Sequence, residues 1–263
     1  MTDKLEQKLG PVLGYGAQAT VYGKDGYAVK LYRQGYPKLN VFSEAIVMAN
    51  LEAVGFPSPK VHEILLIDGQ YGLRMDQIKG EPMMRAEGIP DMEPEVFQPL
   101  INELVDLQVK WQRNHEIAQW AVPTRARLQS DLHRSQALSD ALRAKLLGML
   151  EQLPDGEALN HGDFHGGNVF FDGKDYTVID LLQISKGDPA ADALMSYASY
   201  YLSSPEIADY YLNRYSEVSG IPKADIMRWR PVFAGTMLDA VPEKFQPAVR
   251  ELLGEELLAL NEQ

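Results

Sequence analysis

The 263-residue chain contains no cysteine, so it can form neither a disulfide framework nor a metal site with thiolate ligands. No apolar run approaches the roughly 18 residues that a membrane-spanning helix needs, and we expect no membrane association. Residues 1–7 lack the apolar core of a secretory signal. Together these absences lead us to expect a cytoplasmic protein.

Basic residues are also few, with 25 Lys and Arg against 37 Asp and Glu, for a formal net charge of −12. Such a chain repels the phosphate backbone of nucleic acids, so we expect no nucleic-acid partner. The same charge would attract a cationic small molecule; the alternative is that the surplus carboxylates simply keep the protein soluble. The length is sufficient for one large domain or two modest lobes.

The pattern of apolar residues changes near residue 79. Before it, strand-like segments and turns surround one helical segment: residues 12–13, 20–22, 27–32, a helix over 41–54, and a hairpin over 61–78 that turns at Asp68-Gly69. After it, helical spacing dominates, over 93–117, 125–136, 139–153 and from 189 onward, with a strand-like interruption over 159–179. We therefore predict an α+β fold with an N-terminal antiparallel β-sheet lobe containing one main helix (1–78) and a mostly helical C-terminal lobe (79–263).

The most specific motif is His161-Gly-Asp-Phe-His-Gly-Gly-Asn168. An apolar strand follows, then a turn at Asp172-Gly173 and a second strand that ends on Asp180. This hairpin would bring Asp163, Asn168 and Asp180 together, and such a donor set suits Mg²⁺, which takes one or two carboxylates and completes its shell with phosphate oxygens. Alternatively, Asp163 and Asn168 only cap turns; their occurrence together with Asp180 favours the metal site.

The pattern His161-Gly-Asp-x-x-x-x-Asn168 followed by Ile179-Asp180 resembles the signature of the aminoglycoside phosphotransferases and their relatives, which share the protein-kinase fold. Protein kinases have the same Asp-to-Asn spacing after His-Arg-Asp. Gly162, and the segment Gly187-Asp188-Pro189 with Asp192, are similar to the small-molecule branch. The resemblance extends over nearly the whole chain and implies a protein-kinase-like bilobal fold. From the residues themselves, Asp188 is interpreted as a helix N-cap.

A second motif is Gly14-Tyr-Gly-Ala-Gln-Ala-Thr-Val21. Gly14 and Gly16 would allow a tight turn whose amides approach phosphate oxygens, although ordinary hairpins use the same residues. The segment resembles the kinase glycine-rich loop, with Ala19 in place of the third glycine. A strand follows it, and this excludes a dinucleotide-binding fingerprint, in which a helix follows.

The third motif is Ala28-Val-Lys30, at the position where the kinase pattern has its phosphate-pairing lysine. Strand alternation places Ala28 and Lys30 on one face, but it does not bury Lys30. Glu44 lies in the apolar stripe of the helix expected over 41–54. Because a buried carboxylate needs a partner, we predict a Lys30–Glu44 pair. A solvated Glu44 near the start of the helix is the alternative.

By resemblance, the segment before Lys79-Gly80 joins the two lobes and contacts adenine through its backbone. The contacts are assigned to Met75, Asp76, Gln77 and Ile78, among which the sequence cannot choose because they involve main-chain groups.

The resemblance also implies the roles of the remaining residues. Lys30, oriented by Glu44, would hold the α- and β-phosphates of ATP, while Asn168 and Asp180 would hold Mg²⁺. Asp163 would orient the acceptor hydroxyl and take its proton late, because an aspartate with a pKa near ~4 is a poor early base for an alcohol. His161 and His165 are interpreted as braces of the loop.

The expected function is ATP-dependent transfer of a phosphoryl group to a hydroxyl of a small molecule, for which an aminoglycoside is one candidate. Choline, homoserine, fructosamine and methylthioribose are alternative acceptors. A protein kinase is disfavoured because no Ala-Pro-Glu follows Asp180, and a non-catalytic nucleotide-binding module because the lysine and both aspartates are present. Nucleotidyl transfer is a further alternative. Carboxylates near the C-terminus would line the acceptor pocket or form a solvated helix face: Asp239, Glu243, Glu251, Glu255 and Glu256. The oligomeric state is open.

Overall fold

The structure is a computed structural model that describes residues 2–16, 18–85, 89, 91–113 and 118–261. It divides into two compact units. Unit 1 comprises Met1–Met83 and Asn168–Leu182, and unit 2 comprises Met84–Gly167 and Gln183–Gln263. Within the described ranges, no helix combines the length and the apolar character that crossing a membrane requires.

The described residues of unit 1 contain a five-stranded antiparallel sheet. Its strands, in the order β1-β2-β3-β5-β4, are β1 (Val12–Tyr15), β2 (Ala19–Lys24), β3 (Tyr27–Tyr32), β5 (Gln70–Asp76) and β4 (Val61–Ile67). Asp68 and Gly69 connect β4 to β5 with φ values of 50° and 82°, which suit a tight two-residue hairpin turn. The predicted hairpin is therefore confirmed. The register pairs Lys30 with Val21 on β2 and with Leu73 on β5, so Lys30 lies in the middle of the sheet.

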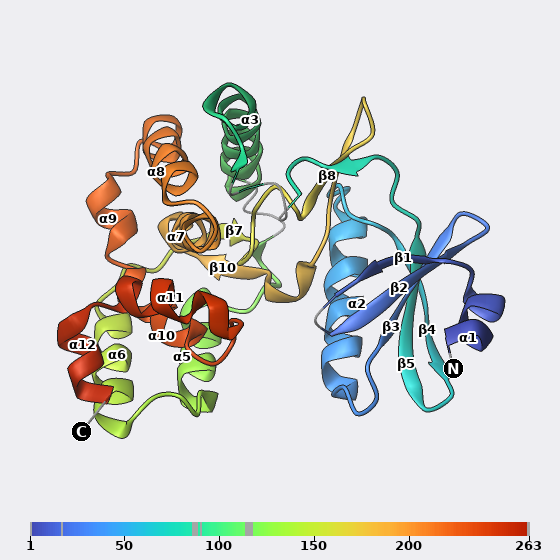
Figure 1. The fold of residues 1–263 in the computed structure, drawn as a ribbon, viewed down its shortest axis with the longest axis horizontal. Coiled ribbons are helices and arrows are strands. Elements are labelled where there is room, and N and C mark those ends of the chain that lie inside the picture. The colour runs from blue at the N-terminus through green and yellow to red at the C-terminus, as the bar shows by residue number, and fades with distance from the viewer. Residues whose placement is uncertain (1, 17, 86–88, 90, 114–117, 262–263) are drawn as a thin grey trace. The chain divides into compact units, whose positions relative to one another are not determined.

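Helices cover both faces of this sheet (Figure 1). The main helix α2 (Lys38–Ala53) confirms the helix predicted over 41–54, although it begins three residues earlier. It contacts β4 and β5. The shorter helix α1 (Thr2–Leu9) contacts β2, and its Leu9 joins Val29 and Leu31 in a buried cluster. We did not predict α1. Because the two helices lie on opposite faces, Val29 and Leu31 pack toward α1 and the alternate residues of β3 face α2.

A second, smaller sheet of unit 1 contains the hairpin that the sequence predicts. Its described strands are β6 (Glu81–Pro82), β8 (Val169–Phe171) and β9 (Tyr176–Val178), in the order β6-β8-β9. The Val178 amide also donates to the Pro57 carbonyl at 2.7 Å. Backbone hydrogen bonds thus fasten residues 168–182 to the N-terminal part of the chain, so the compact units do not follow a single boundary near residue 79.

Unit 2 is mostly helical. Its described helices include α3 (Pro94–Gln112), α5 (Thr124–Arg134), α6 (Asp140–Glu151), α7 (Pro189–Tyr201), α8 (Pro205–Ser219), α9 (Lys223–Met227), α10 (Arg230–Met237), α11 (Gln246–Leu253) and α12 (Glu255–Asn261). The antiparallel strands β7 (Ala158–Asn160) and β10 (Ser185–Gly187) pair beside α7. Short 3₁₀ turns occur at Leu181–Gln183, which spans the boundary between the units, and at Glu243–Phe245. The predicted helix over 93–117 is confirmed as far as Gln112, and residues 114–117 lie outside the described residues.

Helix α7 is central in unit 2 and contacts α8, α9, α10 and β7 (Figure 1). The Asp188 side chain accepts a hydrogen bond from the Ala190 amide at 3.0 Å, and Pro189 occupies the first turn. The N-cap interpretation of Asp188 is therefore confirmed. Both residues are well suited to these positions, because the cap satisfies an otherwise free amide and proline has no amide to satisfy.

Candidate functional site

The first part of the site is a buried ion pair in unit 1. Lys30 Nζ lies 2.7 Å from Glu44 Oε1, and Glu44 is only 4% exposed. Strand β3 supplies the lysine from the middle of the sheet and α2 supplies the glutamate from the helix that covers the same face. The predicted Lys30–Glu44 pair is confirmed.

Tyr32 is a third member of this cluster, which we did not predict. Its hydroxyl donates to Glu44 Oε2 at 2.6 Å, and its ring centroid lies 5.4 Å from Lys30 Nζ. Burial and the charge of Glu44 raise the pKa of Tyr32, so the hydroxyl remains a donor. A signal was available in the sequence, because strand alternation places Tyr32 on the same face as Lys30.

The β8–β9 hairpin positions Asn168 and Asp180. Val169 pairs with Val178, and the Asn168 carbonyl accepts from the Ile179 amide at 3.0 Å, so Asn168 and Asp180 lie at the open end of the hairpin. Asp180 is exposed and has a left-handed backbone, with φ of 59°, a conformation that aspartate tolerates better than most residues. Its charge is also one of the smaller causes that raise the pKa of Tyr32, which places Asp180 within electrostatic reach of the Lys30–Glu44 cluster.

The donor set of unit 1 fits a phosphate-bound Mg²⁺ better than a metal site made by protein alone. Among the described residues, no group of three or more His, Asp or Glu side chains could hold a metal ion. Asp180 and Asn168 offer one carboxylate and one amide oxygen. Such a small protein donor set suits Mg²⁺, which usually retains several water ligands and is coordinated by phosphate oxygens of the substrate. These two residues would hold the ion only together with a nucleotide.

The glycine-bearing turn joins β1 to β2. The Gly16 amide donates to the Ala19 carbonyl at 2.8 Å; Ala17 lies outside the described residues. Neither Gly14 nor Gly16 has a positive φ, and a Cβ atom added at Gly14 would meet no atom of the described residues within 4 Å, its chain neighbours aside. Neither the backbone conformation nor packing against the described residues therefore requires glycine at position 14.

The four residues assigned to adenine recognition span the end of β5. Met75 lies in the ladder, paired with Ala28 and Val61. The Asp76 and Gln77 amides donate to the carbonyls of Lys60 and Gly26, at 3.0 and 3.1 Å. In the described part of the chain, the Ile78 amide has no such acceptor. Of the four amides, that of Ile78 is the one left to donate to a ligand.

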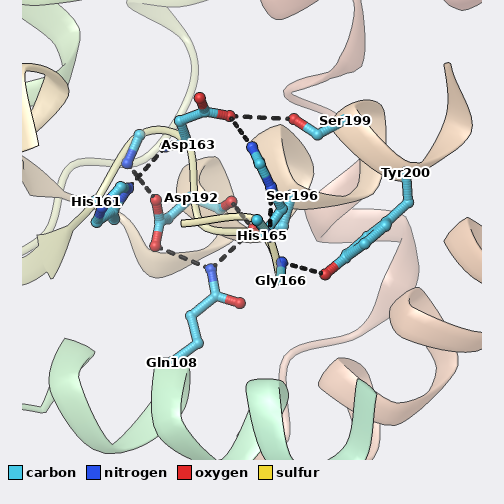
Figure 2. Close-up of polar contacts among 11 residues, drawn as sticks. Gln108, His161, Asp163, His165, Gly166, Asp192, Ser196, Ser199 and Tyr200 are labelled. Atoms are coloured by element: carbon cyan, nitrogen blue, oxygen red, sulfur yellow. Dashed lines mark hydrogen bonds and ion pairs between the residues drawn. The ribbon is translucent and has the colours of Figure 1, made fainter. Parts of the chain in front are cut away.

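In unit 2, the loop that carries Asp163 is held by its own histidines (Figure 2). The Asp163 amide donates to His161 Nδ1 at 3.2 Å, and the Gly167 amide donates to His165 Nδ1 at 3.1 Å. The interpretation of both histidines as braces is confirmed by these contacts.

The Asp163 carboxylate is partly exposed, at 22% of its side chain. Its Oδ1 accepts from the Ser199 hydroxyl at 3.3 Å and lies 3.6 Å from His165 Nε2. In Figure 2, both contacts reach one carboxylate oxygen. Ser199 comes from α7, so the central helix of the unit helps to fix the orientation of Asp163. We did not predict this role for Ser199.

Below the loop, Asp192 is 2% exposed and anchors the backbone. Its Oδ1 accepts from the Gly162 amide at 2.7 Å, and its Oδ2 accepts from Gln108 Nε2 at 2.9 Å (Figure 2). The same Oδ2 also accepts from Gln112 Nε2 at 3.1 Å. These neutral donors compensate a carboxylate that would otherwise be costly to bury. An acid in the otherwise apolar first turn of α7 was the signal for such a role.

Glycine at position 162 has two physical reasons. Its φ is 84°, in the left-handed region, where residues with a Cβ atom are strained. A Cβ atom would also lie 2.8 Å from both Cβ and the carbonyl oxygen of Gln183. The tight turn lets the amide of Gly162 reach Asp192.

Arg127 places a cation near this loop. It donates to Gln183 Oε1 at 3.1 Å. Burial lowers the pKa of Arg127, and the charges of Asp131, Asp192 and Asp163 oppose that change. Nothing in the sequence pattern singled out this arginine.

Among the C-terminal carboxylates, Asp239 has a structural role. Its Oδ2 accepts from the Gln136 amide at 2.7 Å, and its Oδ1 accepts from the Ser135 hydroxyl at 2.9 Å. It thereby fixes the connection between α5 and α6.

Comparison with known proteins identifies the class of the molecule. The sequence model of the phosphotransferase enzyme family (APH) matches residues 14–232. The chain therefore belongs to the phosphotransferase enzyme family. A comparison with curated protein sequences finds no match.

Solved structures with the same fold include kinases for different small molecules. An aminoglycoside-3′-phosphotransferase of type VIII is 18% identical, with a TM-score of 0.61 over 96% of this chain and 97% of that one. A choline/ethanolamine kinase family protein from Mesorhizobium loti is 14% identical, with a TM-score of 0.64 over 100% and 95%. The choline kinase LicA from Streptococcus pneumoniae is 13% identical, with a TM-score of 0.63 over 95% and 98%; LicA is also known in complex with AMP. These similarities confirm the predicted α+β, protein-kinase-like bilobal class.

Proposed function

We propose that this phosphotransferase transfers the γ-phosphate of ATP to a hydroxyl group of a small molecule. One observation carries the proposal: the buried Lys30–Glu44 ion pair and the β8–β9 hairpin, whose open end carries Asn168 and Asp180, belong to the same compact unit. An ammonium group and a carboxylate suited to a metal, held in one unit, match the two charges that a triphosphate with Mg²⁺ presents.

Within this proposal, the N-terminal lobe (1–78) binds ATP together with the hairpin at 168–182. Lys30 holds the α- and β-phosphates, and Glu44 orients Lys30. Gly14 leaves open space that a phosphate can approach, because, its chain neighbours aside, no described residue would come within 4 Å of a Cβ atom there. The Ile78 amide donates to the adenine ring. The bound AMP of LicA, a protein with the same fold, supports a nucleotide site.

Asn168 and Asp180 hold Mg²⁺ in the proposed site. When bound, Mg²⁺ neutralises charge on the phosphate oxygens. Both donors come from one hairpin whose strands are fixed by the Val169–Val178 pair, so the backbone positions of the two residues are set before any ligand arrives.

The C-terminal lobe (79–263) supplies Asp163 and the acceptor site. Asp163 accepts the hydrogen bond of the acceptor hydroxyl, whose oxygen forms a bond to the γ-phosphorus while the bond between that phosphorus and the β–γ bridging oxygen breaks. ADP leaves, and the hydroxyl proton passes to Asp163 late in the transfer. Ser199 and His165 hold the carboxylate in place.

For the acceptor, we propose a cationic alcohol such as an aminoglycoside or an amino alcohol. The net charge of −12 favours a cation, and the proteins with the same fold include aminoglycoside phosphotransferases and choline kinases. A panel of aminoglycosides, amino alcohols and sugars, scored for ADP release, tests this choice. Formation of AMP or pyrophosphate would instead indicate nucleotidyl transfer.

The substitution Asp163→Ala tests the central role. We expect kcat to fall at least about 100-fold, because a positioned proton acceptor is lost, while the Kd for ATP stays within a factor of about two of wild type. Asp175→Ala, which removes an exposed carboxylate from the turn of the β8–β9 hairpin, is the matched control and should leave both values unchanged. Near-normal turnover of Asp163→Ala would reject the assignment.

A further inference from the structure

A chain of aromatic and polar contacts in unit 1 links the glycine-bearing turn to the Lys30–Glu44 ion pair. We call it the tyrosine relay, and it consists of Gln18, Tyr36, Tyr32, Glu44 and Lys30. Its members come from the β1–β2 turn, from β3 and the segment after it, and from α2. Only the last two belong to the phosphate site of the proposed function.

The contacts of the relay are continuous. The Tyr36 hydroxyl donates to Gln18 Oε1 at 2.7 Å. The rings of Tyr36 and Tyr32 stack with centroids 4.8 Å apart and an interplanar angle of 15°. The Tyr32 hydroxyl then donates to Glu44 Oε2 at 2.6 Å, and Glu44 Oε1 accepts from Lys30 Nζ at 2.7 Å.

The backbone supports both ends of the relay. The Arg33 amide donates to the Gln18 carbonyl at 3.0 Å, which ties the turn to the end of β3. Gln70 Nε2 donates to the Tyr32 carbonyl at 2.8 Å. Tyr32 is fully buried, at 0% exposure, so its ring has no freedom to leave the stack without opening the core.

The two oxygens of Glu44 have different partners, and this has a consequence for Lys30. A carboxylate held by one partner can rotate about its terminal bonds, whereas two donors on different oxygens fix its plane. Lysine is a flexible chain that ends in a point charge, so the position of its ammonium group depends on what holds it. Without the Tyr32 hydroxyl, Glu44 would keep one buried oxygen unsatisfied and would hold Lys30 less firmly.

We propose that Tyr32 is a positioning residue that sets the place of the phosphate-binding lysine through Glu44, and that Tyr36 and Gln18 extend this hold to the glycine-bearing turn. The inference rests on the proposed function for its effect on ATP, but not for its effect on Lys30. The turn and the ammonium group are thereby ordered together, before a nucleotide binds.

The reactivity of Lys30 in the nucleotide-free protein tests the proposal independently of any activity. Pulsed acetylation with acetic anhydride, read by mass spectrometry, compares wild type with Tyr32→Phe, which keeps the ring and removes the hydroxyl. We expect Lys30 to react about tenfold faster in the variant, the size of effect expected for a lost hydrogen bond to a charged group. Equal reaction rates would overturn the proposal.

Tyr22→Phe is the matched control. Tyr22 lies on the adjacent strand β2, is also buried at 4% exposure, and pairs with Val29, one residue before Lys30. Its hydroxyl makes no contact with Glu44. Acetylation of Lys30 should match wild type in this variant, and melting followed by circular dichroism establishes that both variants are folded at the labelling temperature. If Tyr32→Phe melts early, the labelling is done at a lower temperature, where it is folded.

A double-mutant cycle shows whether Tyr32 acts through Glu44. In a Glu44→Gln background, Tyr32→Phe should change Lys30 acetylation by less than about twofold, because the charge that the hydroxyl orients is gone. Additive effects of the two substitutions would reject the route through Glu44.

Measurements with ATP examine the consequence for the proposed function. Tyr32→Phe should raise the KM for ATP about tenfold with a smaller change in kcat. Tyr36→Phe should raise the KM for ATP less and leave Lys30 acetylation at the wild-type rate.

A wild-type protein that neither binds ATP nor releases ADP would refute the proposed function, and the acetylation result would still decide the role of Tyr32. An unchanged KM in an active Tyr32→Phe variant would overturn the link to the nucleotide.

Discussion

Glu44 shows how a single buried carboxylate depends on its neighbours. It is 4% exposed, and desolvation of an anion to that extent is costly unless every lone pair finds a partner. Lys30 supplies the opposite charge and Tyr32 supplies a neutral donor. Removing either partner leaves a different deficit: loss of Lys30 leaves an uncompensated charge, whereas loss of the Tyr32 hydroxyl leaves an unsatisfied oxygen.

The substitution Lys30→Met should therefore lower the free energy of unfolding by about 3 kcal/mol, because it leaves Glu44 without its counter-ion. Denaturant unfolding measures the change. The double substitution Lys30→Met with Glu44→Gln should recover most of the stability but none of the ATP binding. Lys24→Met, at the exposed end of β2, is the control and should alter neither. If the single and double variants unfolded alike, the pair would contribute no charge compensation.

Asp180 should act only when the metal is present. For Asp180→Ala we expect ATP binding to weaken at least about tenfold in the presence of Mg²⁺, because one of its few protein ligands is lost. Without Mg²⁺ the variant should bind ATP at least as well as wild type, since a negative charge near the phosphates has been removed. Calorimetric titrations with Mg²⁺ and with a chelator measure both values, and Asp175→Ala provides the comparison. An equal loss under both conditions would contradict a metal-binding role.

At the scale of elements, the sequence predicts those whose residues carry a periodic signal. The apolar residues at helical spacing over 41–54 predicted both helix α2 and the burial of Glu44. The Asp68-Gly69 turn predicted the β4–β5 hairpin. Helix α1 was not predicted because its eight residues contain only two apolar positions whose packing is described, Leu5 and Leu9. Its partners, Val29 and Leu31, lie about twenty residues away in the chain, and short-range periodicity cannot reveal such contacts.

The residues of the candidate site divide in the same way, into those with a local sequence signal and those identified only by their tertiary contacts. Lys30, Glu44, Asp163, Asn168 and Asp180 were predicted from motifs whose members are close in sequence or lie on a recognised pattern. Ser199 and Gln108 were not, because a serine and a glutamine on helices give no local sign of what they contact across the fold. Asp192 was noted only by resemblance, and its hydrogen bond to the Gly162 amide needed the tertiary structure.

The segment after β5 leads to a prediction about the backbone. Ile78→Pro removes the amide that is left without an acceptor in the described part of the chain, and we expect the Kd for ATP to rise up to about tenfold from the loss of one hydrogen bond. Ile78→Ala removes most of the side chain but keeps the amide, so it should bind ATP nearly as well as wild type. Fluorescence titration with a labelled adenine nucleotide compares the two. Equal affinities would move the adenine contact to another residue.

At the scale of the whole molecule, the two compact units do not coincide with the two segments on either side of residue 79 that the sequence pattern distinguishes. Unit 1 is completed by residues 168–182, whose strand β8 pairs with β6 and whose Val178 binds the Pro57 carbonyl. Val169 and Val178 are both fully buried, so a chain that stops at residue 83 would lack part of its core. No local sequence pattern predicts that residues 168–182 belong to unit 1, because their place is fixed by backbone pairing between distant segments.

A fragment consisting of residues 1–83 should accordingly be less stable than the same fragment joined to residues 168–182 by a flexible glycine-serine linker. We expect the joined form to show a cooperative thermal transition and the shorter one to show a broad transition or none, since the buried valines and the β6 pairing are missing. Circular dichroism and amide exchange provide the comparison. Equal cooperativity would mean that the hairpin adds nothing to the folding of the N-terminal part.

The late arrival of this hairpin also bears on how the protein is made. Residue 182 follows residue 83 by 99 positions, and at a translation rate of roughly 5–20 residues per second the nascent chain waits roughly 5–20 s for the piece that completes its first unit. During that interval the partner edge of β6 is open while the ribosome is still adding the helices of the second unit. The nascent chain therefore passes through this interval with an incomplete first unit, and the rate at which positions 84–167 are translated sets how long the interval lasts.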